Sequence, residues 1–325
     1  MKAAVVHSYN APPGYADFAD PAPTSDEVLV TVAAAGLHQI VKSLANGKHY
    51  LSTGNFPFVP GVDGVGRLED GSRVYFGASH SPFGTFAERS IAARGRTIPI
   101  PDSLDDVTVA AMMNPGMASW GALTERAQFA AGESVLILGA TGNAGRLAVQ
   151  VAKRLGARRI VAAGRDPQVL EKTRSLGADA IISLQLDPDA LVSAFRQEFA
   201  SNRIDVILDY VWGPAAEAVL AAIAQRGLDH DPTRIRYVQI GSTAGPTITL
   251  PAATLRSSGL ELLGSGFGSI SMERLFASLA AFMAAAGKAA ADNAPLTIAT
   301  ATAPLRDVES LWNAPDHGAR LVFQP

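Results

Sequence analysis

Residues 133–150 read ESVLILGATGNAGRLAVQ, and this stretch decides the fold. An apolar, β-branched run is followed by three glycines, Gly139, Gly142 and Gly145, and then by a helical pattern. Glycines permit a tight turn and let backbone N–H groups approach a pyrophosphate at the N-terminus of the helix. The strict G-x-G-x-x-G spacing is missing, so a glycine-rich turn of another α/β protein stays an alternative, but the strand–turn–helix context favours a dinucleotide site. The predicted cofactor contacts in this turn are Thr141, Gly142, Asn143 and Ala144.

Strands and helices alternate along the chain around this turn. Apolar runs predict strands at 134–138, 159–163, 180–184, 205–211, 236–240 and 259–263. Helical patterns separate the first four of them, at 144–155, 167–176 and 190–200. Alternation of this kind predicts a parallel, doubly wound sheet. The fold class is therefore α/β, with a Rossmann type of nucleotide-binding domain.

The two ends of the chain have a different pattern. Residues 1–100 hold short β-rich runs at 28–32, 74–76 and 97–100, which prolines and glycines interrupt, and show no long helical periodicity. Behind the last apolar run, a helix is predicted at 271–286 with Ser271 as its cap. The tail predicts a strand, a short helix and a strand, at 296–300, 305–312 and 320–323. This tail is long enough to return to the first, β-rich domain.

Composition excludes several classes of protein. The 325 residues include no cysteine, which removes disulfides, thiolate nucleophiles and cysteine-ligated zinc. The net charge of −3 gives no support to nucleic acid as a partner, and 48% hydrophobic residues exclude a disordered chain. No signal peptide is visible, and no apolar stretch reaches the roughly 20 residues of a membrane span. We therefore expect a cytoplasmic protein with no membrane partner.

The second predicted strand carries a cofactor preference. It ends in Gly164 and Arg165, where enzymes that prefer NAD usually place an acidic residue for the ribose 2′-hydroxyl. A guanidinium instead suits the 2′-phosphate of NADP, and Lys172 and Arg174 follow on the next predicted helix. A solvated surface arginine with Asp166 as its local partner is the alternative. We expect NADPH to be the cofactor, with Gly164 and Arg165 among its contacts.

Several motifs follow one another in the order of a known family. They are PFVPGVDGVG at 57–66, GTFAE at 84–88, GE at 132–133, the glycine turn at 139–145 and LGAD at 176–179. In this order they resemble the medium-chain dehydrogenase/reductase superfamily, especially its zinc-free quinone oxidoreductase branch. The resemblance implies a discontinuous GroES-like, β-rich catalytic domain, 1–112 and 265–325, and a Rossmann NADP-binding domain, 113–264. It also implies a homodimer that pairs edge strands, for which 259–263 is the candidate.

The metal positions of the zinc-dependent relatives are altered. Their G-V-C-H pattern matches residues 36–39, where the cysteine is replaced by His38, and their G-H-E pattern matches residues 61–63, where Val62 cannot bind zinc and Asp63 alone is a poor ligand. We predict no metal, and interpret His38 as a polar residue lining the cleft or as a satisfied loop histidine. Without this Lewis acid, hydride addition to a quinone or an activated C=C becomes the easier chemistry.

Two residues are predicted to act in catalysis. Tyr50, in NGKHY at 46–50, resembles the G-x-Y tyrosine of quinone and enoyl-thioester reductases, with one extra residue in between, and would donate a proton or a hydrogen bond. A tyrosine that shapes the cleft wall is the alternative. Asn114, followed by Pro115, resembles the N-P step of enoyl reductases, where it would face the nicotinamide ribose or the substrate. A simple turn between domains is its alternative.

Further cofactor contacts are expected at the carboxyl ends of the later strands. The resemblance places residues 209–212 near the adenosine and brings two later loops toward the nicotinamide. Trp212, in the first of these segments, is a weaker candidate that could instead be a core aromatic. In the two later loops the predicted contacts are Gly241, Ser242, Gly266 and Phe267.

The function expected from these residues is an NADPH-dependent reductase of a small-molecule quinone, enone or enoyl thioester. A zinc-free reductase of carbonyls and a non-catalytic NADPH-binding protein of the crystallin or sensor kind stay alternatives. A short-chain reductase is excluded because no tyrosine has a lysine four residues later. A serine hydrolase and a P-loop enzyme are excluded because G-x-S-x-G and G-x-x-x-x-G-K-[ST] are absent.

Overall fold

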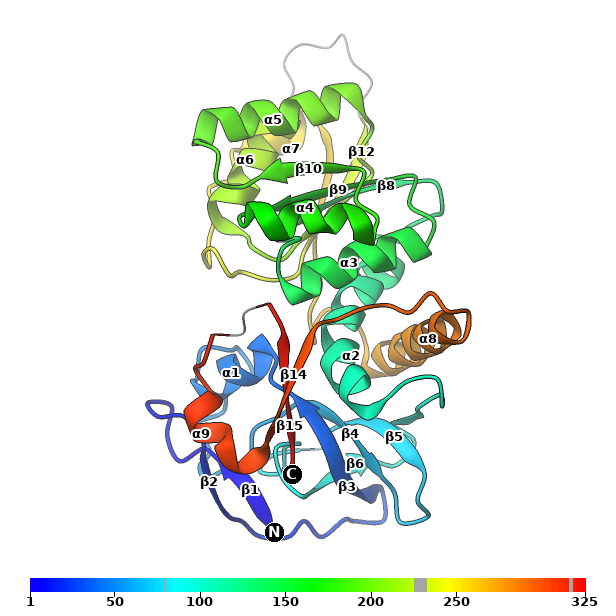
Figure 1. Cartoon of the computed structure of the whole chain (residues 1–325). Helices are drawn as coiled ribbons and strands as arrows, with labels where there is room; N and C mark the ends of the chain where they lie inside the picture. Colours follow the sequence, from blue (N-terminus) through cyan, green and yellow to red (C-terminus); the bar gives the residue numbers. More distant parts are fainter. Residues whose placement is uncertain (79, 225–232, 316–317) are drawn as a thin grey trace. The chain divides into compact units, whose positions relative to one another are not determined.

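The computed structural model describes residues 1–78, 80–224, 233–315 and 318–325. They form two compact units, of which the first joins Met1–Pro115 to Leu279–Pro325 and the second is Gly116–Ser278 (Figure 1). Each unit has its own sheet. The two are described separately below.

The second unit is built on a six-stranded sheet in which every pair of neighbours is parallel. Its strand order is β10-β9-β8-β11-β12-β13. The bounds are β8 Ser134–Leu138, β9 Arg159–Gly164, β10 Ala180–Ser183, β11 Val206–Asp209, β12 Arg234–Gln239 and β13 Gly259–Gly264. The order runs outward in both directions from β8 and β11. This pair is therefore the topological switch point, beyond whose carboxyl ends a ligand is expected.

Helices connect these strands. They are α3 Asn143–Arg154, α4 Pro167–Leu176, α5 Pro188–Ser201, α6 Gly213–Ile223 and α7 Ala252–Arg256. The helix α3 packs on α4, and α5 packs on α6 (Figure 1). All five residues of β8 are buried, which explains why its sequence is a continuous apolar run and not an alternating one. The predicted doubly wound sheet is confirmed, and every predicted strand overlaps an observed one.

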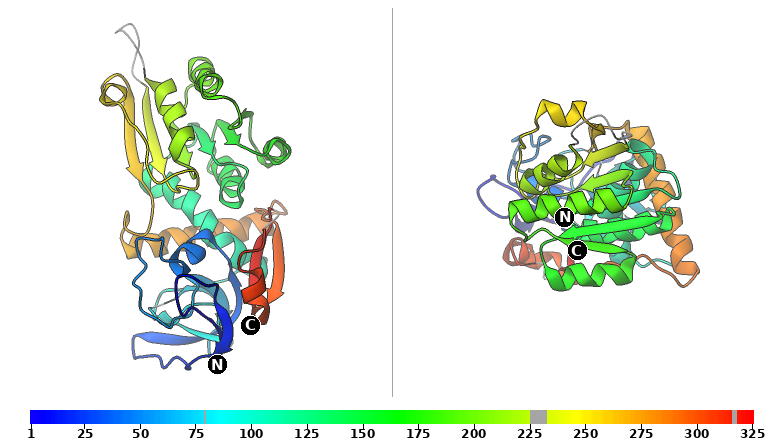
Figure 2. Two further views of the ribbon diagram at one scale, coloured as in Figure 1. Left: turned by 90° about the vertical axis from the view of Figure 1, so that its left-hand side faces the viewer. Right: turned by 90° about the horizontal axis from the view of Figure 1, so that it is seen from above.

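The first unit holds a seven-stranded mixed sheet and a two-stranded one. The large sheet has the order β14-β15-β3-β4-β5-β7, with β6 paired to β3. Its strands are β3 Glu27–Gly36, β4 Asp63–Arg67, β5 Arg73–Gly77, β6 Arg89–Ala93, β7 Thr97–Pro99, β14 Thr300–Pro304 and β15 Arg320–Gln324, and the hairpin joins β1 Lys2–Val5 to β2 Gly14–Asp17. Because β15 pairs with β3, segments from the two ends of the chain share one sheet, and the two termini lie near each other (Figure 2). The predicted α/β class, with a β-rich part and a doubly wound part, is confirmed.

Helices α1 and α2 were not predicted from the sequence. Helix α1, Gln39–Ala45, lies where no helix was expected. Helix α2, Asp106–Gly121, continues as the π-helix Ala122–Arg126 and contains Asn114 and Pro115. The interpretation of Asn114 as part of a simple turn is therefore wrong. Residues 109–113 are all buried, so α2 is apolar all round and shows no amphipathic stripe.

The bounds of the elements in the C-terminal tail also differ from the prediction. Its first strand was expected at 296–300, but β14 is Thr300–Pro304. Parallel pairing of Thr300 with Arg320 sets this register. The following helix is short, with Leu305–Asp307 in 3₁₀ form and α9 at Val308–Leu311. The buried Leu296 that attracted the prediction lies outside the strand.

Helix α8, Met272–Ala291, begins as predicted. The Ser271 hydroxyl accepts a hydrogen bond from the Arg274 N–H at 3.3 Å, which is the expected cap. Among the described residues, α8 alone has the length and apolar composition of a candidate membrane span, and 44% of that window is buried within the structure. Its buried positions recur at helical spacing, as in a core helix: Leu275, Leu279, Phe282, Met283, Ala286 and Ala289.

Candidate functional site

The glycine turn holds α3 close to the end of β8. Gly139 has a φ of +89°, and its N–H and that of Ala140 both donate to the Ala163 carbonyl at 2.9 Å. A Cβ atom at Gly145 would lie 2.2 Å from the Gly139 carbonyl oxygen. Gly145 is therefore required by backbone packing, which agrees with the helix–strand contact that the third glycine makes in dinucleotide turns.

Packing within the protein does not require a glycine at position 142. It caps α3 with φ −74° and ψ 165°, and a Cβ atom there would meet nothing closer than 3.5 Å. No side chain caps α3, whereas Asp166 and Asp187 cap α4 and α5. The first N–H groups of α3 thus have no side-chain partner, and with the helix dipole they make an anion site. The open space at Gly142 fits a phosphate group seated on this helix end.

Asn143 and Ala144 follow in the first turn of α3. The Asn143 side chain is buried, and its Oδ1 accepts a hydrogen bond from Arg146 Nη2 at 2.5 Å. This oxygen is therefore already used within the protein. The backbone N–H groups of both residues are the part of the predicted contacts that suits an anion.

Arg165 stands in an open pocket at the ends of β8, β9 and β10. The pocket is lined by Thr141, Arg165, Asp166, Pro167, Gln168 and Gln185. Gly164 lets Thr141 pack against the end of β9, because a Cβ atom at this glycine would lie 2.4 Å from Thr141 Cγ2. The structure thus brings Thr141, Gly164 and Arg165 together, as is expected of residues that contact the same ligand.

Arg165 is exposed and makes no ion pair within the described part of the chain. The expected local partner, Asp166, is otherwise engaged, since its Oδ1 accepts from the N–H groups of Gln168 at 2.9 Å and Val169 at 3.0 Å. Arg174 is tied to Glu171 at 2.9 Å. The guanidinium of Arg165 is therefore the cation best placed for a phosphate in this pocket.

The later strand ends are shaped mainly by internal contacts. A Cβ atom at Gly241 would lie 2.6 Å from the Tyr210 carbonyl oxygen, so backbone packing already requires this glycine. Trp212 packs edge-to-face on Tyr237, which favours its role as a core aromatic. Ser242 is exposed, as are Gly266 and Phe267 in the loop behind β13.

That loop is fastened from within the same unit. Ser269 Oγ accepts from the Gly266 N–H at 2.8 Å, and Arg126 Nη1 donates to the Ser269 carbonyl at 3.1 Å. Phe267 is 36% exposed on the held loop. An exposed phenylalanine on a fixed loop suits contact with a flat ring, as predicted for Phe267.

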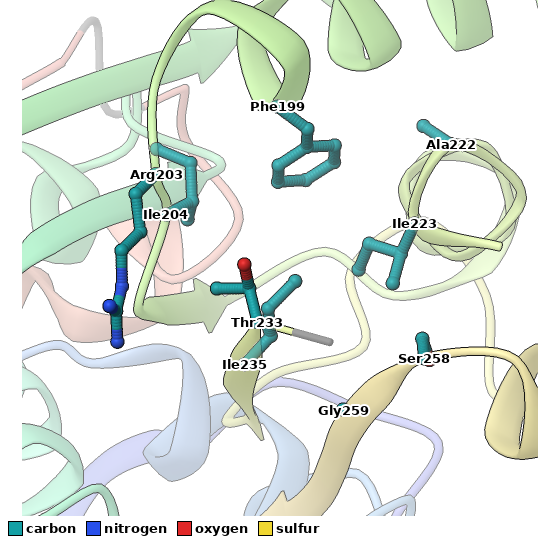
Figure 3. Close-up of a pocket in the computed structure, with 9 residues that line it drawn as sticks. All are labelled: Phe199, Arg203, Ile204, Ala222, Ile223, Thr233, Ile235, Ser258 and Gly259. Atoms are coloured by element: carbon teal, nitrogen blue, oxygen red, sulfur yellow. The ribbon is translucent and has the colours of Figure 1, made fainter. Parts of the chain in front are cut away.

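A second pocket in this unit lies at the opposite ends of the strands, the amino ends. It is lined by Ile204, Ile235 and Gly259 near the amino ends of β11, β12 and β13, and by Phe199 and Ile223 near the ends of α5 and α6 (Figure 3). Arg203 at its rim pairs with Asp205 at 2.5 Å. Ligands of open α/β sheets bind at the carboxyl ends, so this pocket is not the cofactor site.

Tyr50 lies in the first unit on an exposed loop. Its side chain is 70% exposed and stacks on His49 with ring centroids 4.2 Å apart. Tyr9 supports the loop, since its hydroxyl accepts from the Gly54 N–H at 2.6 Å and its ring meets Phe56 edge-to-face. Tyr50 is thus an exposed residue on a braced loop.

The other predicted catalytic residue belongs to a buried cluster that the sequence did not reveal. We call it the Asp63 cluster; it consists of Asp63, His38, Tyr75, Asn114 and Arg320. Tyr75 donates to Asp63 Oδ2 at 2.8 Å and Asn114 Nδ2 to Oδ1 at 3.5 Å, while His38 Nε2 lies 3.8 Å from Oδ1. Arg320 Nη1 donates to the Leu37 carbonyl at 2.6 Å.

Burial dominates the electrostatics of this cluster. It raises the pKa of Asp63 to about 7, although the Tyr75 hydrogen bond, the Arg320 charge and Asn114 oppose the shift. Burial also lowers the pKa of His38 well below 6.5, with a smaller contribution from Arg320, while the Ala110 carbonyl acts against it. His38 is thus a neutral imidazole at pH 7.

His38 is a buried member of the cluster, 2% exposed. Neither ring nitrogen has a hydrogen bond of good geometry to another described residue, and the Ala110 carbonyl is the group that raises its pKa. Within the described residues no three His, Asp or Glu side chains form a group that could hold a metal ion.

Comparison with known proteins shows which proteins the chain resembles. A model for zinc-binding dehydrogenases matches residues 144–285. The probable NADPH-dependent quinone reductase tdiC of Emericella nidulans is 28% identical over the whole of both chains. The quinone oxidoreductase of Thermus thermophilus, whose crystal structures include a complex with NADPH, is 26% identical with a TM-score of 0.81, and the match covers 100% of each chain. These matches make the chain similar over its whole length to quinone reductases of the medium-chain dehydrogenase/reductase superfamily.

Further relatives match about half of the chain. The quinone oxidoreductase of Rattus norvegicus is 32% identical over 46% of this chain and 48% of its own. The trans-enoyl reductase pgmF of Aspergillus terreus is 31% identical over 48% of each. The range matched by the zinc-binding model leaves out His38, Val62 and Asp63, where the resemblance places metal ligands. A match to that model is therefore compatible with a chain that lacks them.

Proposed function

We propose that this protein is an NADPH-dependent oxidoreductase that transfers hydride to a small quinone or an activated C=C without zinc. Arg165 carries the proposal, because it is an exposed cation without an ion partner in the described structure and lies in the pocket beside the uncapped end of α3. The relatives named for NADPH-dependent quinone reduction and for trans-enoyl reduction support the same activity.

We assign contact residues to each part of the nucleotide. The N–H groups of Gly142, Asn143 and Ala144 receive the pyrophosphate, Thr141 and Gly164 shape the adjoining wall, and Arg165 binds the 2′-phosphate. The strand ends that carry Gly241, Ser242, Gly266 and Phe267 are proposed to receive the nicotinamide end. Bound NADPH supplies the hydride. The protein then has to align the substrate, exclude water and provide a proton.

The division into domains, the oligomeric state and the localisation are also proposals. We propose that residues 1–112 and 265–325 form the catalytic domain and that residues 113–264 form the nucleotide-binding domain. We also propose a cytoplasmic homodimer with a small-molecule substrate.

An assay with a panel of acceptors tests the activity. NADPH oxidation would be followed at equal protein concentration with quinones, enones, crotonyl-type thioesters and simple aldehydes. We expect turnover with a quinone or an activated C=C and little with the aldehydes, which need a stronger electrophile to polarise the carbonyl. Tight NADPH binding without turnover on any acceptor would contradict the proposal and favour a non-catalytic NADPH-binding protein.

Tyr50→Phe tests the proposed donor. The change removes one hydroxyl from a side chain that is 70% exposed, so folding and NADPH binding should not change. If the hydroxyl donates to the substrate, kcat falls about tenfold or more. Tyr15→Phe, at another exposed tyrosine of the same unit, should leave kcat unchanged. Equal kcat values for Tyr50→Phe and the wild type would remove Tyr50 as donor and leave it a wall residue.

Leu262→Glu tests the proposed dimer. Leu262 is 40% exposed on β13, one of the two edge strands of the parallel sheet. An unpaired edge with an exposed apolar side chain is open to pairing with a second copy, and a charge there disfavours this pairing. Sedimentation should show a dimer for the wild type and a monomer for Leu262→Glu, with Leu186→Glu as the exposed control. A monomeric wild type at tens of micromolar would exclude this dimer.

A further inference from the structure

The turn that carries Phe267 is closed by bonds between two of its own residues. Ser269 Oγ accepts from the Gly266 N–H at 2.8 Å and donates to the Gly266 carbonyl at 2.7 Å, and the Ser269 N–H donates to the same carbonyl at 3.0 Å. These bonds fix the shape of the turn but not its place on the unit. Part of that placement comes from the Ser265 N–H, which donates to the Gln239 carbonyl at 2.8 Å.

Arg126 attaches the same turn from a different element. Its Nε donates to the Gly264 carbonyl at 2.8 Å, and its Nη1 donates to the Ser269 carbonyl at 3.1 Å. Gly264 is the last residue of β13, so one guanidinium joins the two ends of the 264–269 loop. A guanidinium presents its donors in a fixed planar fork, so two such bonds set an orientation as well as a distance. We call this pair of bonds the Arg126 bridge.

The π-helix at the end of α2 places Arg126 at this point. The Ala127 N–H donates to the Ala122 carbonyl at 2.8 Å, which is the i→i+5 bond of a π-turn. The preceding residue, Glu125, pairs with Arg274 at 2.5 Å. Two consecutive residues of the π-helix thus hold the segment that follows β13. Turns of this kind often mark functional sites.

The partners of Arg126 indicate that it holds main chain. Within the part of the chain that the structure describes, Arg126 forms no ion pair, and the neighbouring Glu125 is paired with Arg274 instead. The donors of Arg126 bind two backbone carbonyls. They therefore fix the path of the loop itself, and all of these residues belong to the second unit.

We propose that Arg126 is a positioning residue, which holds the 264–269 loop and its Phe267 in the form that receives the nicotinamide ring; this rests on the proposed function. Arg126 acts through the loop. A loop that is already held in place loses little freedom when the cofactor binds. It also keeps the ring aligned for hydride transfer, where a displacement of about 1 Å can cost about 100-fold in rate.

A comparison of two ligands separates positioning from stability. The fragment 2′,5′-ADP has the adenosine and the 2′-phosphate of NADPH but no nicotinamide, so it uses the Arg165 pocket alone. Arg126→Met removes every donor of the bridge. It should raise the Kd for NADPH about tenfold and lower kcat about 10- to 100-fold, while the Kd for 2′,5′-ADP stays unchanged. A general loss of stability would weaken both ligands alike, and that result would overturn the proposal.

Two further arginine variants serve as a test of the bridge and as a control. Arg126→Lys keeps the charge but replaces the fork by a point donor, so it should resemble Arg126→Met. Wild-type NADPH affinity in Arg126→Lys would overturn the bridge. Arg234 fastens the same strand β13 elsewhere, through Glu261 at 2.7 Å. Arg234→Met should therefore leave kcat and both Kd values unchanged.

A double variant tests whether Arg126 acts through Phe267. In a Phe267→Ala background, Arg126→Met should weaken NADPH binding clearly less than in the wild type, because coupled residues are not additive. The same loss in both backgrounds would overturn this route.

Ser269→Ala keeps the proposal testable if Arg126→Met does not fold. It removes only the hydroxyl that closes the turn, and it should weaken NADPH binding without affecting 2′,5′-ADP. Turnover with unchanged Kd values in these variants overturns the positioning role and leaves the proposed function standing. A wild type that binds NADPH without turnover contradicts the proposed function, and the two Kd values then still decide the role of Arg126.

Discussion

Arg165→Ala is expected to raise KM for NADPH by about 10- to 100-fold and to leave KM for NADH nearly unchanged. A hydrogen bond to a charged partner contributes about 1.5–3 kcal/mol, and each 1.4 kcal/mol corresponds to a factor of ten. Arg165 is exposed and has no ion partner within the described residues, so its removal should leave the fold intact. Steady-state kinetics with both nucleotides measure the change.

Arg174→Ala is the matched control for this prediction. Arg174 lies on the next helix and carries the same charge, but it is paired with Glu171 and donates to the Asp179 carbonyl. Its removal should change the two KM values alike and only slightly. An equal rise of both KM values in Arg165→Ala would show that Arg165 does not read the 2′-phosphate.

Gly145→Ala is expected to destabilise the nucleotide-binding unit by about 3 kcal/mol and to abolish NADPH binding. The added Cβ atom would lie 2.2 Å from the Gly139 carbonyl oxygen and 2.6 Å from the Ala140 Cα atom. Both neighbours are backbone, so α3 would have to move away from β8. Thermal unfolding and NADPH titration measure the two effects.

Gly142→Ala tests the phosphate site without an expected effect on the stability of the fold. This glycine has an ordinary φ of −74°, and a Cβ atom there would meet nothing closer than 3.5 Å. The variant should unfold like the wild type yet bind NADPH about tenfold more weakly, because the methyl group would occupy the space given to the phosphate. Unchanged NADPH affinity in a stable Gly142→Ala would place the pyrophosphate elsewhere.

The nucleotide-binding unit could be predicted from sequence because its signals are local. Several helix boundaries carry their own signal, as in Asp166 and Pro167 at the start of α4 and Gly177, with φ +124°, at its end. The central strands β8, β9 and β11 are buried on both faces, so they appear as continuous apolar runs. Predictions of this kind need no knowledge of distant residues.

The Asp63 cluster could not be found in this way. Its residues come from positions 38, 63, 75, 114 and 320, which only the pairing of distant strands brings together. The pKa of Asp63 follows from burial, and burial is a property of the folded chain. Helix α2 was missed for a related reason, since a helix that is buried all round has no amphipathic period.

The place of β15 between β3 and β14 also sets the order in which the protein matures. During synthesis the nucleotide-binding unit, Gly116–Ser278, is complete in the emerging chain long before residues 320–324 leave the ribosome. Until then β3 lacks its partner, and Arg320 has not reached the Asp63 cluster. The nascent chain is therefore able to form its nucleotide-binding unit before it can complete the unit that holds the Asp63 cluster.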